Sequence, residues 1–164
     1  MDSAYNQIVS LIWNIADDVL RDVFLRGQYR DVILPMVVLR RIDALLEPTK
    51  EAVEAKIKEI EDDGFEVEDE DITDVTGLNY YNRSKWTLSR LKSQAADDEN
   101  ILYDNFVEYL NGFSDNVKDV LQNFDYYNKA KKLADNKRLL SIIERITDPH
   151  INLTDRPAND PDGL

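Results

Sequence analysis

The stretch from Ile12 to Lys50, IWNIADDVLRDVFLRGQYRDVILPMVVLRRIDALLEPTK, decides the fold of this chain. Its first part has the residue spacing of an amphipathic helix and breaks near Gly27. Its second part, YRDVILPMVVLRRIDALL, is too apolar to leave any face freely exposed. A helix of that composition must be covered on all sides, so the stretch predicts the central helix of a helical domain, with the other elements packed around it.

The two helices of this stretch are bounded by glycine and proline. The first is predicted over residues 3–25 and ends before Gly27. One apolar stripe runs along it, formed by Ile8, Leu11, Ile12, Ile15 and Val19. Pro35 lies inside the second helix and removes one backbone hydrogen bond, which predicts a kink rather than an end, because the apolar periodicity continues to Leu46. Pro48 then marks a boundary, since it suits the first turn of a new helix.

Further helices are predicted along the rest of the chain by apolar spacing and capping residues. They are a charged helix over 49–61, a helix capped by Ser84, one from Asp97 or Asp98 to Gly112, one capped by Ser114, and a region over 128–147 with a break near Asp135-Asn136. The sequence therefore predicts an all-α fold, a multi-helix bundle of six or seven helices around a kinked apolar helix. Residues 1–148 form this domain, and residues 149–164, rich in proline and without periodicity, form a linker or tail.

One internal segment does not fit the helical pattern. Residues 61–75 carry nine acids, no base and only weak alternation. We expect an acidic surface loop there, with room for one short extended piece.

Composition limits the class of protein. The chain has 164 residues, 43% of them apolar, and no cysteine, which excludes disulfides and thiolate metal sites. Its longest apolar runs are about eight residues, whereas a membrane span needs roughly 20. Met1 is followed by polar residues rather than by a basic leader. We therefore expect a cytoplasmic protein with no membrane partner.

Charge is distributed unevenly along the chain. The net charge of −13 argues against autonomous binding to nucleic acid, because a phosphate backbone is repelled by such a field. Residues 76–96, in contrast, carry four bases and no acid, and residues 129–145 carry six bases against two acids. A locally basic face on an acidic body is therefore predicted.

The stretch from Ile12 to Lys50 resembles the beginning of a known family, the modification (M) subunits of type I restriction-modification systems, which are adenine-specific DNA methyltransferases. Those subunits open with a helix close to LW-x-x-A-D-x-L-R-G, followed by E-Y-x-x-V-I-L-x-L-L-F-L-(K/R)-(R/Y)-(I/L)-(S/D). The matching positions here are Ile12, Trp13, Ala16, Asp17, Leu20, Arg21, Tyr29, Val32 to Leu34, and Leu39 to Asp43. Most of these are core residues, so the resemblance depends on their ordered combination.

The resemblance implies a role inside a larger enzyme. In that family a helical domain of this size precedes a methyltransferase domain, which uses S-adenosylmethionine. Two M subunits join one specificity (S) subunit, and R subunits join them for restriction. The helical domain is thought to help enclose the DNA and to contact other subunits. The chain is therefore expected to be the non-catalytic opening domain of an adenine-N6 DNA methyltransferase subunit, with residues 149–164 leading toward the catalytic domain.

The catalytic signatures of that family are not found in these 164 residues. The five glycines are isolated, so no glycine-bearing turn for the cofactor is apparent, and no two prolines are adjacent, so the Asn/Asp-Pro-Pro-aromatic motif is missing. Asp148-Pro149-His150 is only distantly similar to that motif, because it lacks the second proline. We expect no catalytic, cofactor-binding or metal-binding residues and no activity from this segment alone.

Candidate contacts to DNA or a partner protein come from the basic segments and the tyrosine pairs beside them. The main candidates are Lys129, Lys131, Lys132, Lys137 and Arg138. The secondary ones are Arg83, Lys85, Arg90 and Lys92, and the tyrosine pairs are Tyr80 with Tyr81 and Tyr126 with Tyr127. A tyrosine next to a base suits a contact with a flat apolar surface and a phosphate. The simpler interpretation is that one tyrosine of each pair packs inward and the other caps a helix.

Other candidates are weaker. His150 is the only histidine, which excludes a multi-histidine metal site. The carboxylates of 66–71 could attract Ca²⁺ but lack the ligand order of an EF-hand, so a solvated loop is favoured. Trp13 and Trp86 are expected to be packing anchors. An alternative function remains open: a stand-alone acidic helical interaction module whose carboxylates mimic DNA phosphates and occupy a DNA-binding partner.

Overall fold

The computed structural model describes residues 3–95 and 98–148, and for residues 3–9, 11 and 12 it describes the backbone only. The described part is all-α, as predicted, and contains no strand; its one β-bridge joins Asn82 and Phe113. The α-helices are α1 (Ser3–Leu20), α2 (Tyr29–Leu46), α3 (Lys50–Asp62), α4 (Asp69–Thr76), α5 (Leu88–Ser93), α6 (Glu99–Asn111), α7 (Asp115–Asn123), α8 (Tyr126–Asp135) and α9 (Leu139–Ile146). Two short 3₁₀ helices, Arg26–Gln28 and Glu47–Thr49, flank α2.

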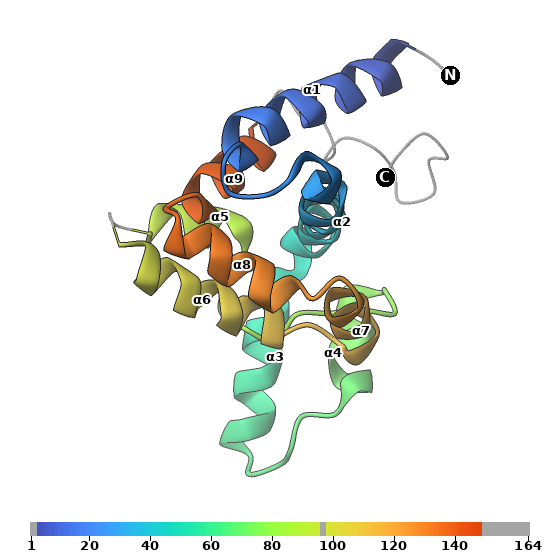
Figure 1. Ribbon diagram of the computed structural model, residues 1–164. Helices are drawn as coiled ribbons and strands as arrows, with labels where there is room; N and C mark the ends of the chain where they lie inside the picture. Colours follow the sequence, from blue (N-terminus) through green and yellow to red (C-terminus); the bar gives the residue numbers. More distant parts are fainter. Residues whose placement is uncertain (1–2, 96–97, 149–164) are drawn as a thin grey trace.

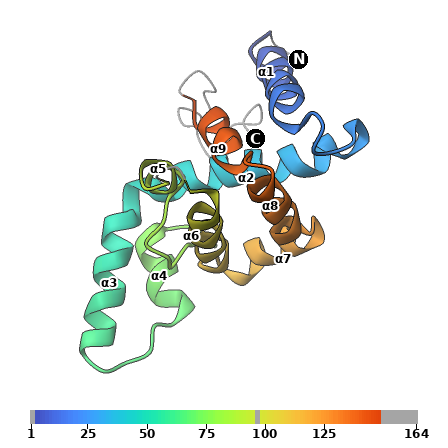
Figure 2. The same ribbon diagram turned by 60° about the vertical axis from the view of Figure 1, so that its left-hand side comes forward.

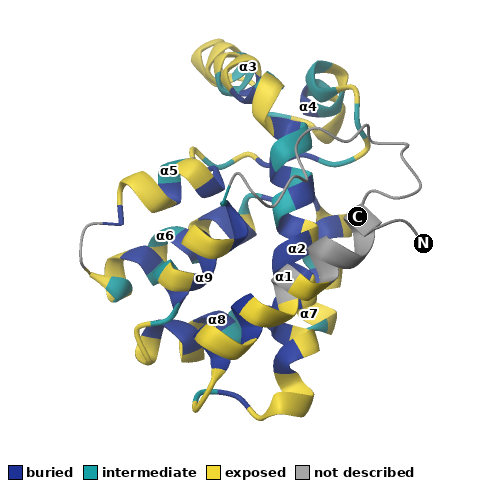
Figure 3. Cartoon of the chain, turned by 90° about the horizontal axis from the view of Figure 1, so that it is seen from above, coloured by how far each residue is buried: buried dark blue, intermediate teal, exposed yellow. Residues whose placement is uncertain are grey.

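Helix α2 lies in the middle of the molecule, against α1, α8 and α9 (Figures 1 and 3). Its apolar sequence supplies Val32, Met36 and Leu39, all almost completely buried. The helix runs uninterrupted through Pro35, as the continuing periodicity predicts. The hydroxyl of Tyr126 on α8 donates to the Val32 carbonyl oxygen at 3.3 Å, which joins α8 to the turn of α2 before the proline.

A second group of helices completes the main core. Helices α6, α8 and α9 pack on one another, and α9 also contacts α1 and α5. Phe106, Tyr109 and Phe113 form a row of aromatic rings, with centroids 6.0 Å and 4.9 Å apart along it. Rings at these separations add to the stabilisation that burial alone provides. We call α1, α2 and α5–α9 the body.

Helices α3 and α4 form a hairpin that projects from the body (Figures 1 and 2). We call residues 50–76 the acidic arm. It has a separate small core made by Val53, Ile72 and Tyr81, the last of which comes from the chain just after the arm. Most of its other residues are exposed (Figure 3), and Phe65 at its tip is among the most exposed apolar side chains described.

The expectation of an acidic surface loop over 61–75 holds for residues 63–68 but was wrong for the second half of the segment, which α4 occupies. The Glu68 backbone N–H donates to Asp71 Oδ2 at 2.9 Å, which caps the first turn. Acids in a first turn also interact favourably with the helix dipole. Ile72 provides a fully buried anchor, and Gly77, at φ 70°, ends the helix in the left-handed conformation.

Other boundaries differ from the prediction by a few residues. Helix α1 ends at Leu20 rather than near residue 25, with Asp22 at φ 68°. Helix α5 starts at Leu88, capped by the Thr87 hydroxyl, which accepts from Arg90 N at 3.0 Å, rather than at Ser84. The break after α8 is confirmed, with Lys137 at φ 59°. Asp98 caps α6, as one of the two predicted positions.

The prediction that α2 leaves no face exposed was also wrong. Leu34 and Val38 are each more than one third exposed, because the nearest neighbour on that side, α7, has only nine residues and covers α2 incompletely. Of the two tryptophans, Trp86 is buried as expected and Trp13 is half-exposed. Among the described residues, no helix is long and apolar enough to cross a membrane.

Candidate nucleic-acid and subunit interface

Helix α8 carries three of the five main basic candidates and exposes two of them. Its buried face, formed by Tyr126, Ala130, Leu133 and Ala134, packs on the body. This leaves Lys131 and Lys132 exposed on the opposite side. The sequence places lysines at the positions between apolar ones, so the amphipathic pattern alone creates the basic face.

The lysines of α8 are oriented by neighbouring side chains. Lys131 Nζ lies 3.1 Å from Asp135 Oδ1 and 5.1 Å from the ring centre of Tyr103 on α6. Lys132 Nζ lies 4.7 Å from the ring centre of Phe24, which places it beside the turn between α1 and α2. Both contacts hold a charge near the surface without burying it, because a cation over an aromatic ring remains hydrated on its other side. Lys129 is partly buried and donates to the Phe124 carbonyl oxygen, so it is oriented toward α7.

Lys137 and Arg138 occupy the turn between α8 and α9. Lys137 is exposed, whereas Arg138 is partly buried and its Nε has no hydrogen-bond partner. Arg138 lines a polar cavity of about 430 Å³ between α1 and α9, together with Asp18, Val19, Ser141, Glu144, Arg145 and Asp148. Three carboxylates surround the two arginines there, and Arg145 is 3.3 Å from Asp18 Oδ2. The cavity lining therefore carries one more acidic than basic side chain and does not resemble an anion site.

The secondary basic segment is used differently, because its arginines connect the acidic arm to the body. Arg83 Nη2 lies 3.0 Å from Asp69 Oδ1 and donates to the Val67 carbonyl oxygen at 3.2 Å. Arg90 Nη1 lies 2.5 Å from Glu54 Oε1. Lys85 Nζ is 4.9 Å from the Trp86 ring centre, and Lys92 is exposed. Two of the four predicted contacts are thus engaged within the molecule.

One member of each tyrosine pair packs inward, as the simpler interpretation predicts, but the other member caps none of the described helices. Tyr126 is fully buried, and Tyr81 is buried with its hydroxyl donating to Asp69 Oδ1 at 2.6 Å. Tyr80 and Tyr127 are partly buried, and the Tyr127 hydroxyl donates to Asn111 Oδ1 at 2.8 Å. Burial raises the pKa of all four phenols. None of the four tyrosine side chains is as exposed to solvent as Lys131 or Lys132.

A buried polar cluster between α2, α5 and α6 was not predicted. Asp43 Oδ1 accepts from Leu88 N and from the Tyr109 hydroxyl, each at 3.0 Å. Burial raises the pKa of Asp43, and the two hydrogen bonds only partly offset this. The cluster fixes the start of α5 against α2, so its role is architectural. The sequence signal was an aspartate inside an otherwise apolar helix.

Lys50 is the first residue of α3 and of the acidic arm. Its Nζ donates to the carbonyl oxygens of Ser84 and Asn82, the latter at 3.3 Å. Burial lowers the pKa of Lys50 to about 8. A lysine that serves two backbone carbonyls is a structural residue, and its position joins the arm to the chain segment that follows it.

Comparison with known proteins gives one match. A family model described as the HsdM N-terminal domain matches residues 8–146, from within α1 to the end of α9. The chain belongs to the HsdM N-terminal domain family. Neither the curated proteins nor the solved structures compared with the chain gave a match.

Membership of the HsdM N-terminal family identifies these residues as the N-terminal domain of a type I restriction-modification methyltransferase subunit, as the resemblance implied. The described residues of this HsdM domain do not fit S-adenosylmethionine. A methyltransferase holds that cofactor at the carboxyl edge of a parallel sheet, and the described part of the chain has no strand. Nor does that part contain a group of three or more acidic or histidine side chains that could hold a metal ion. His150 and the segment 149–164 lie outside the described residues.

Proposed function

We propose that this HsdM N-terminal domain is a non-catalytic part of an adenine-N6 DNA methyltransferase subunit, and that it helps to enclose DNA and to contact other subunits. The partners would be the S subunit, a second M subunit and, in the restriction complex, the R subunit. The methyltransferase domain expected beyond residues 149–164 would carry out the chemistry.

The observation that supports a DNA-contacting role is the basic face of α8. Lys131 and Lys132 on α8, and Lys137 in the turn that follows it, are exposed in a chain whose net charge is −13. Only Lys131 forms an ion pair, and that pair is surface-exposed, so a phosphate could replace the carboxylate at little cost. Lysine contacts to phosphate position a protein on DNA without reading the sequence. This suits a subunit whose recognition site is set elsewhere.

The position of the acidic arm is compatible with this role. The tip of the arm lies far from α8 in both ribbon views (Figures 1 and 2). The screening length at physiological salt is about 8 Å, so distant carboxylates repel DNA on α8 only weakly. The overall negative charge therefore does not preclude a phosphate contact on this face, although it disfavours strong binding by the domain alone.

The test is charge reversal on α8 in the assembled methyltransferase complex. Lys131→Glu, Lys132→Glu and Lys137→Glu together should weaken DNA binding and lower the slope of log affinity against log salt by about 0.9 for each lost phosphate contact. Lys56→Glu with Lys58→Glu on the arm is the control and should leave the slope unchanged. Unchanged affinity and slope in the α8 variant would remove this face from the proposal.

A second candidate is the stand-alone acidic module that mimics DNA. It is favoured by the acidic arm, where Glu61, Asp62, Asp63 and Glu66 are exposed around one projecting turn. The two candidates predict opposite results when isolated chain is added to a DNA-binding S subunit. A mimic would compete with DNA in proportion to its concentration, whereas the domain proposed first would not displace DNA.

A further inference from the structure

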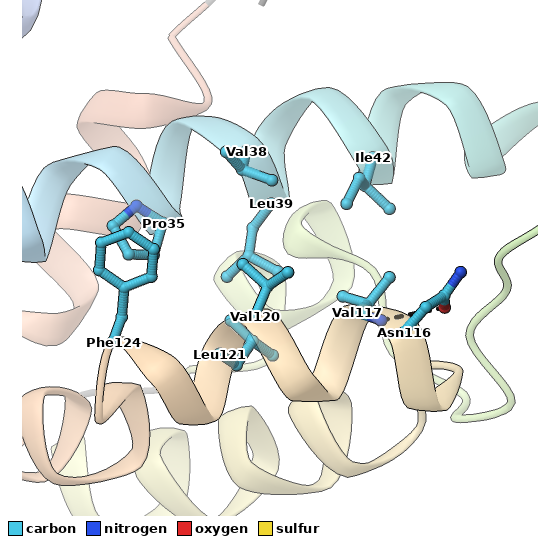
Figure 4. A pocket seen from close by; sticks show the side chains of 9 residues that line it. All are labelled: Pro35, Val38, Leu39, Ile42, Asn116, Val117, Val120, Leu121 and Phe124. Atoms are coloured by element: carbon cyan, nitrogen blue, oxygen red, sulfur yellow. Dashed lines mark hydrogen bonds between the residues drawn. The ribbon is translucent and has the colours of Figure 1, made fainter.

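An apolar groove lies between α2 and α7, on the side of α2 that the other helices leave open (Figure 4). Its lining consists of Pro35, Val38, Leu39, Ile42, Asn116, Val117, Val120, Leu121 and Phe124. Leu39, Val117 and Leu121 are buried and form its floor. The ring of Phe124 lies beside Pro35 and closes one end (Figure 4).

The edges of the groove are apolar and exposed to solvent. Val38 is 36% exposed on α2, and Val120 is 42% exposed on α7. Leu34, one helical turn before Val38, is 38% exposed and extends the same strip. Single exposed apolar residues are ordinary, but several of them gathered around one concave site indicate a binding surface.

The size of the groove limits what it can hold. Its volume is about 130 Å³, which is similar to that of an engineered cavity of about 150 Å³ that binds benzene. One leucine, isoleucine, methionine or phenylalanine side chain fits such a space, and a nucleotide-sized cofactor does not. In protein interfaces, much of the binding energy usually comes from a few large side chains that each fill a well-packed pocket.

Two exposed carboxylates are close in sequence to residues that line the groove. Asp31 lies one turn before Pro35 on the same face of α2, and Asp119 precedes Val120 on α7; neither forms an ion pair within the described part of the chain. The nearest lysine of α7, Lys118, is already 3.5 Å from Asp115 Oδ1. At the far end, Asn116 Nδ2 donates to the Asn79 carbonyl oxygen at 2.9 Å, which brings the groove close to the segment that follows the acidic arm. A partner segment with basic residues on either side of its apolar anchor would be complementary in charge to these carboxylates.

We propose that the groove between α2 and α7 docks an amphipathic helix of a partner protein, which inserts one large apolar anchor flanked by lysine or arginine. Two helices side by side form the kind of trough into which a third helix lays its apolar face. The groove is formed without contributions from the α8 lysines, so this inference goes beyond the proposed DNA contact and does not depend on it.

The test uses two synthetic probes and the full chain. The first probe is a fluorescein-labelled helical peptide of leucine and lysine with leucines on one face, and the second replaces every lysine with glutamate. Fluorescence anisotropy at physiological salt should give saturable one-to-one binding of the lysine peptide and none of the glutamate peptide. Val120→Asp should weaken the binding at least tenfold.

The matched control separates the groove from the overall negative charge. Ile101 on α6 is 49% exposed, so Ile101→Asp removes a similar apolar side chain and adds the same charge outside the groove. It should change the affinity less than twofold. Val38→Asp tests the opposite edge of the groove, and circular dichroism establishes that each variant is folded.

Three results would overturn the proposal. The first is equal weakening by Val120→Asp and Ile101→Asp, and the second is equal binding of the two peptides. The third is self-association of the wild-type chain in sedimentation experiments that Val120→Asp abolishes, since a second copy would then be the occupant. None of these results depends on whether α8 contacts DNA.

Discussion

The body and the acidic arm are stabilised in different ways. The body contains one continuous core to which α1, α2 and α5–α9 all contribute buried apolar residues. The arm has a core of only three buried residues, Val53, Ile72 and Tyr81. Its remaining attachments are polar: Asp69 pairs with Tyr81 and Arg83, and Glu54 pairs with Arg90.

This difference indicates that the arm and the body have different free energies of local unfolding. Exposed ion pairs contribute about 0–1 kcal/mol each, whereas burial of a large apolar side chain contributes about 1.5–3 kcal/mol. The arm should therefore open at a lower free energy than the body, as small, poorly buried units generally do. Regions of low local stability are also those that rearrange most readily when a partner binds.

The largest predicted effect concerns the body core. Phe106→Ala removes a fully buried ring that packs near Tyr109 and Tyr126, and it should lower the free energy of unfolding by about 4 kcal/mol. Urea denaturation followed by circular dichroism measures this loss.

Ile72→Ala in the arm should instead accelerate hydrogen exchange in α3 and α4 and leave α6, α8 and α9 protected. Loss of protection throughout the body in Ile72→Ala would contradict the separation of the two regions.

The next effect concerns the junction between the body and the segment after the arm. A Cβ on Gly112 would lie 2.5 Å from Asn82 Oδ1 and 2.7 Å from Ser84 N. Asn82 has little room to move, because its Nδ2 donates to the Tyr109 carbonyl oxygen at 2.9 Å. Gly112→Ala should therefore cost about 3 kcal/mol by overpacking.

Gly27→Ala is the matched control for this glycine, since nothing lies within 4 Å of a Cβ there. The melting temperature of Gly112→Ala should lie clearly below that of Gly27→Ala. A similar melting temperature for both would mean that residues 82–84 shift easily and make room for the added methyl group.

A smaller effect should appear in the pH dependence of stability. The pKa of Lys50 falls from its ordinary value of 10.5 to about 8 in the folded chain. Its contribution to stability is therefore complete above 10.5 and is lost as the pH falls through about 8. From pH 8 to pH 9.5, the wild-type free energy of unfolding should rise relative to that of Lys50→Met by about 2 kcal/mol. Urea unfolding at several pH values measures the difference, and parallel curves would refute the lowered pKa.

The smallest effect should come from the ion pairs of the arm. Arg83→Gln removes the contact with Asp69 at a site where both side chains are at least one third exposed, and it should cost less than about 1 kcal/mol. Hydrogen exchange in α4 should nevertheless increase, more at low salt than at high salt. A global loss of stability would show that the arm is a structural part of the body.

The sequence predicted those features that depend on local pattern. The apolar run of α2 identified the central helix, Asp98 identified the start of α6, and Asp135-Asn136 identified the break before α9. The basic face of α8 follows from lysines set between buried positions of one helix, so it could also be predicted. Its role in binding DNA remains a prediction.

The features that were missed depend on contacts between distant residues. Helix α4 was hidden because nine acids suggested a solvated loop, and only the packing of Ile72 with Val53 and Tyr81 reveals its buried side. Arg90 was considered a surface contact until the fold placed Glu54 beside it, 36 residues away. The groove between α2 and α7 could not be predicted either, because an apolar helix does not indicate which side its neighbours leave uncovered.

The hydrogen bond from Tyr126 to Val32 has a consequence for folding during synthesis. It joins residues 94 positions apart, and the ion pair between Asp18 and Arg145 spans 127 positions. When α2 leaves the ribosome, α8 and α9 have not yet been translated, so the apolar surface of α2 that these two helices cover remains open to water for most of the elongation time. The nascent chain should therefore bind chaperones until α8 and α9 emerge, because the uncovered apolar side chains of α2 favour aggregation until synthesis is complete.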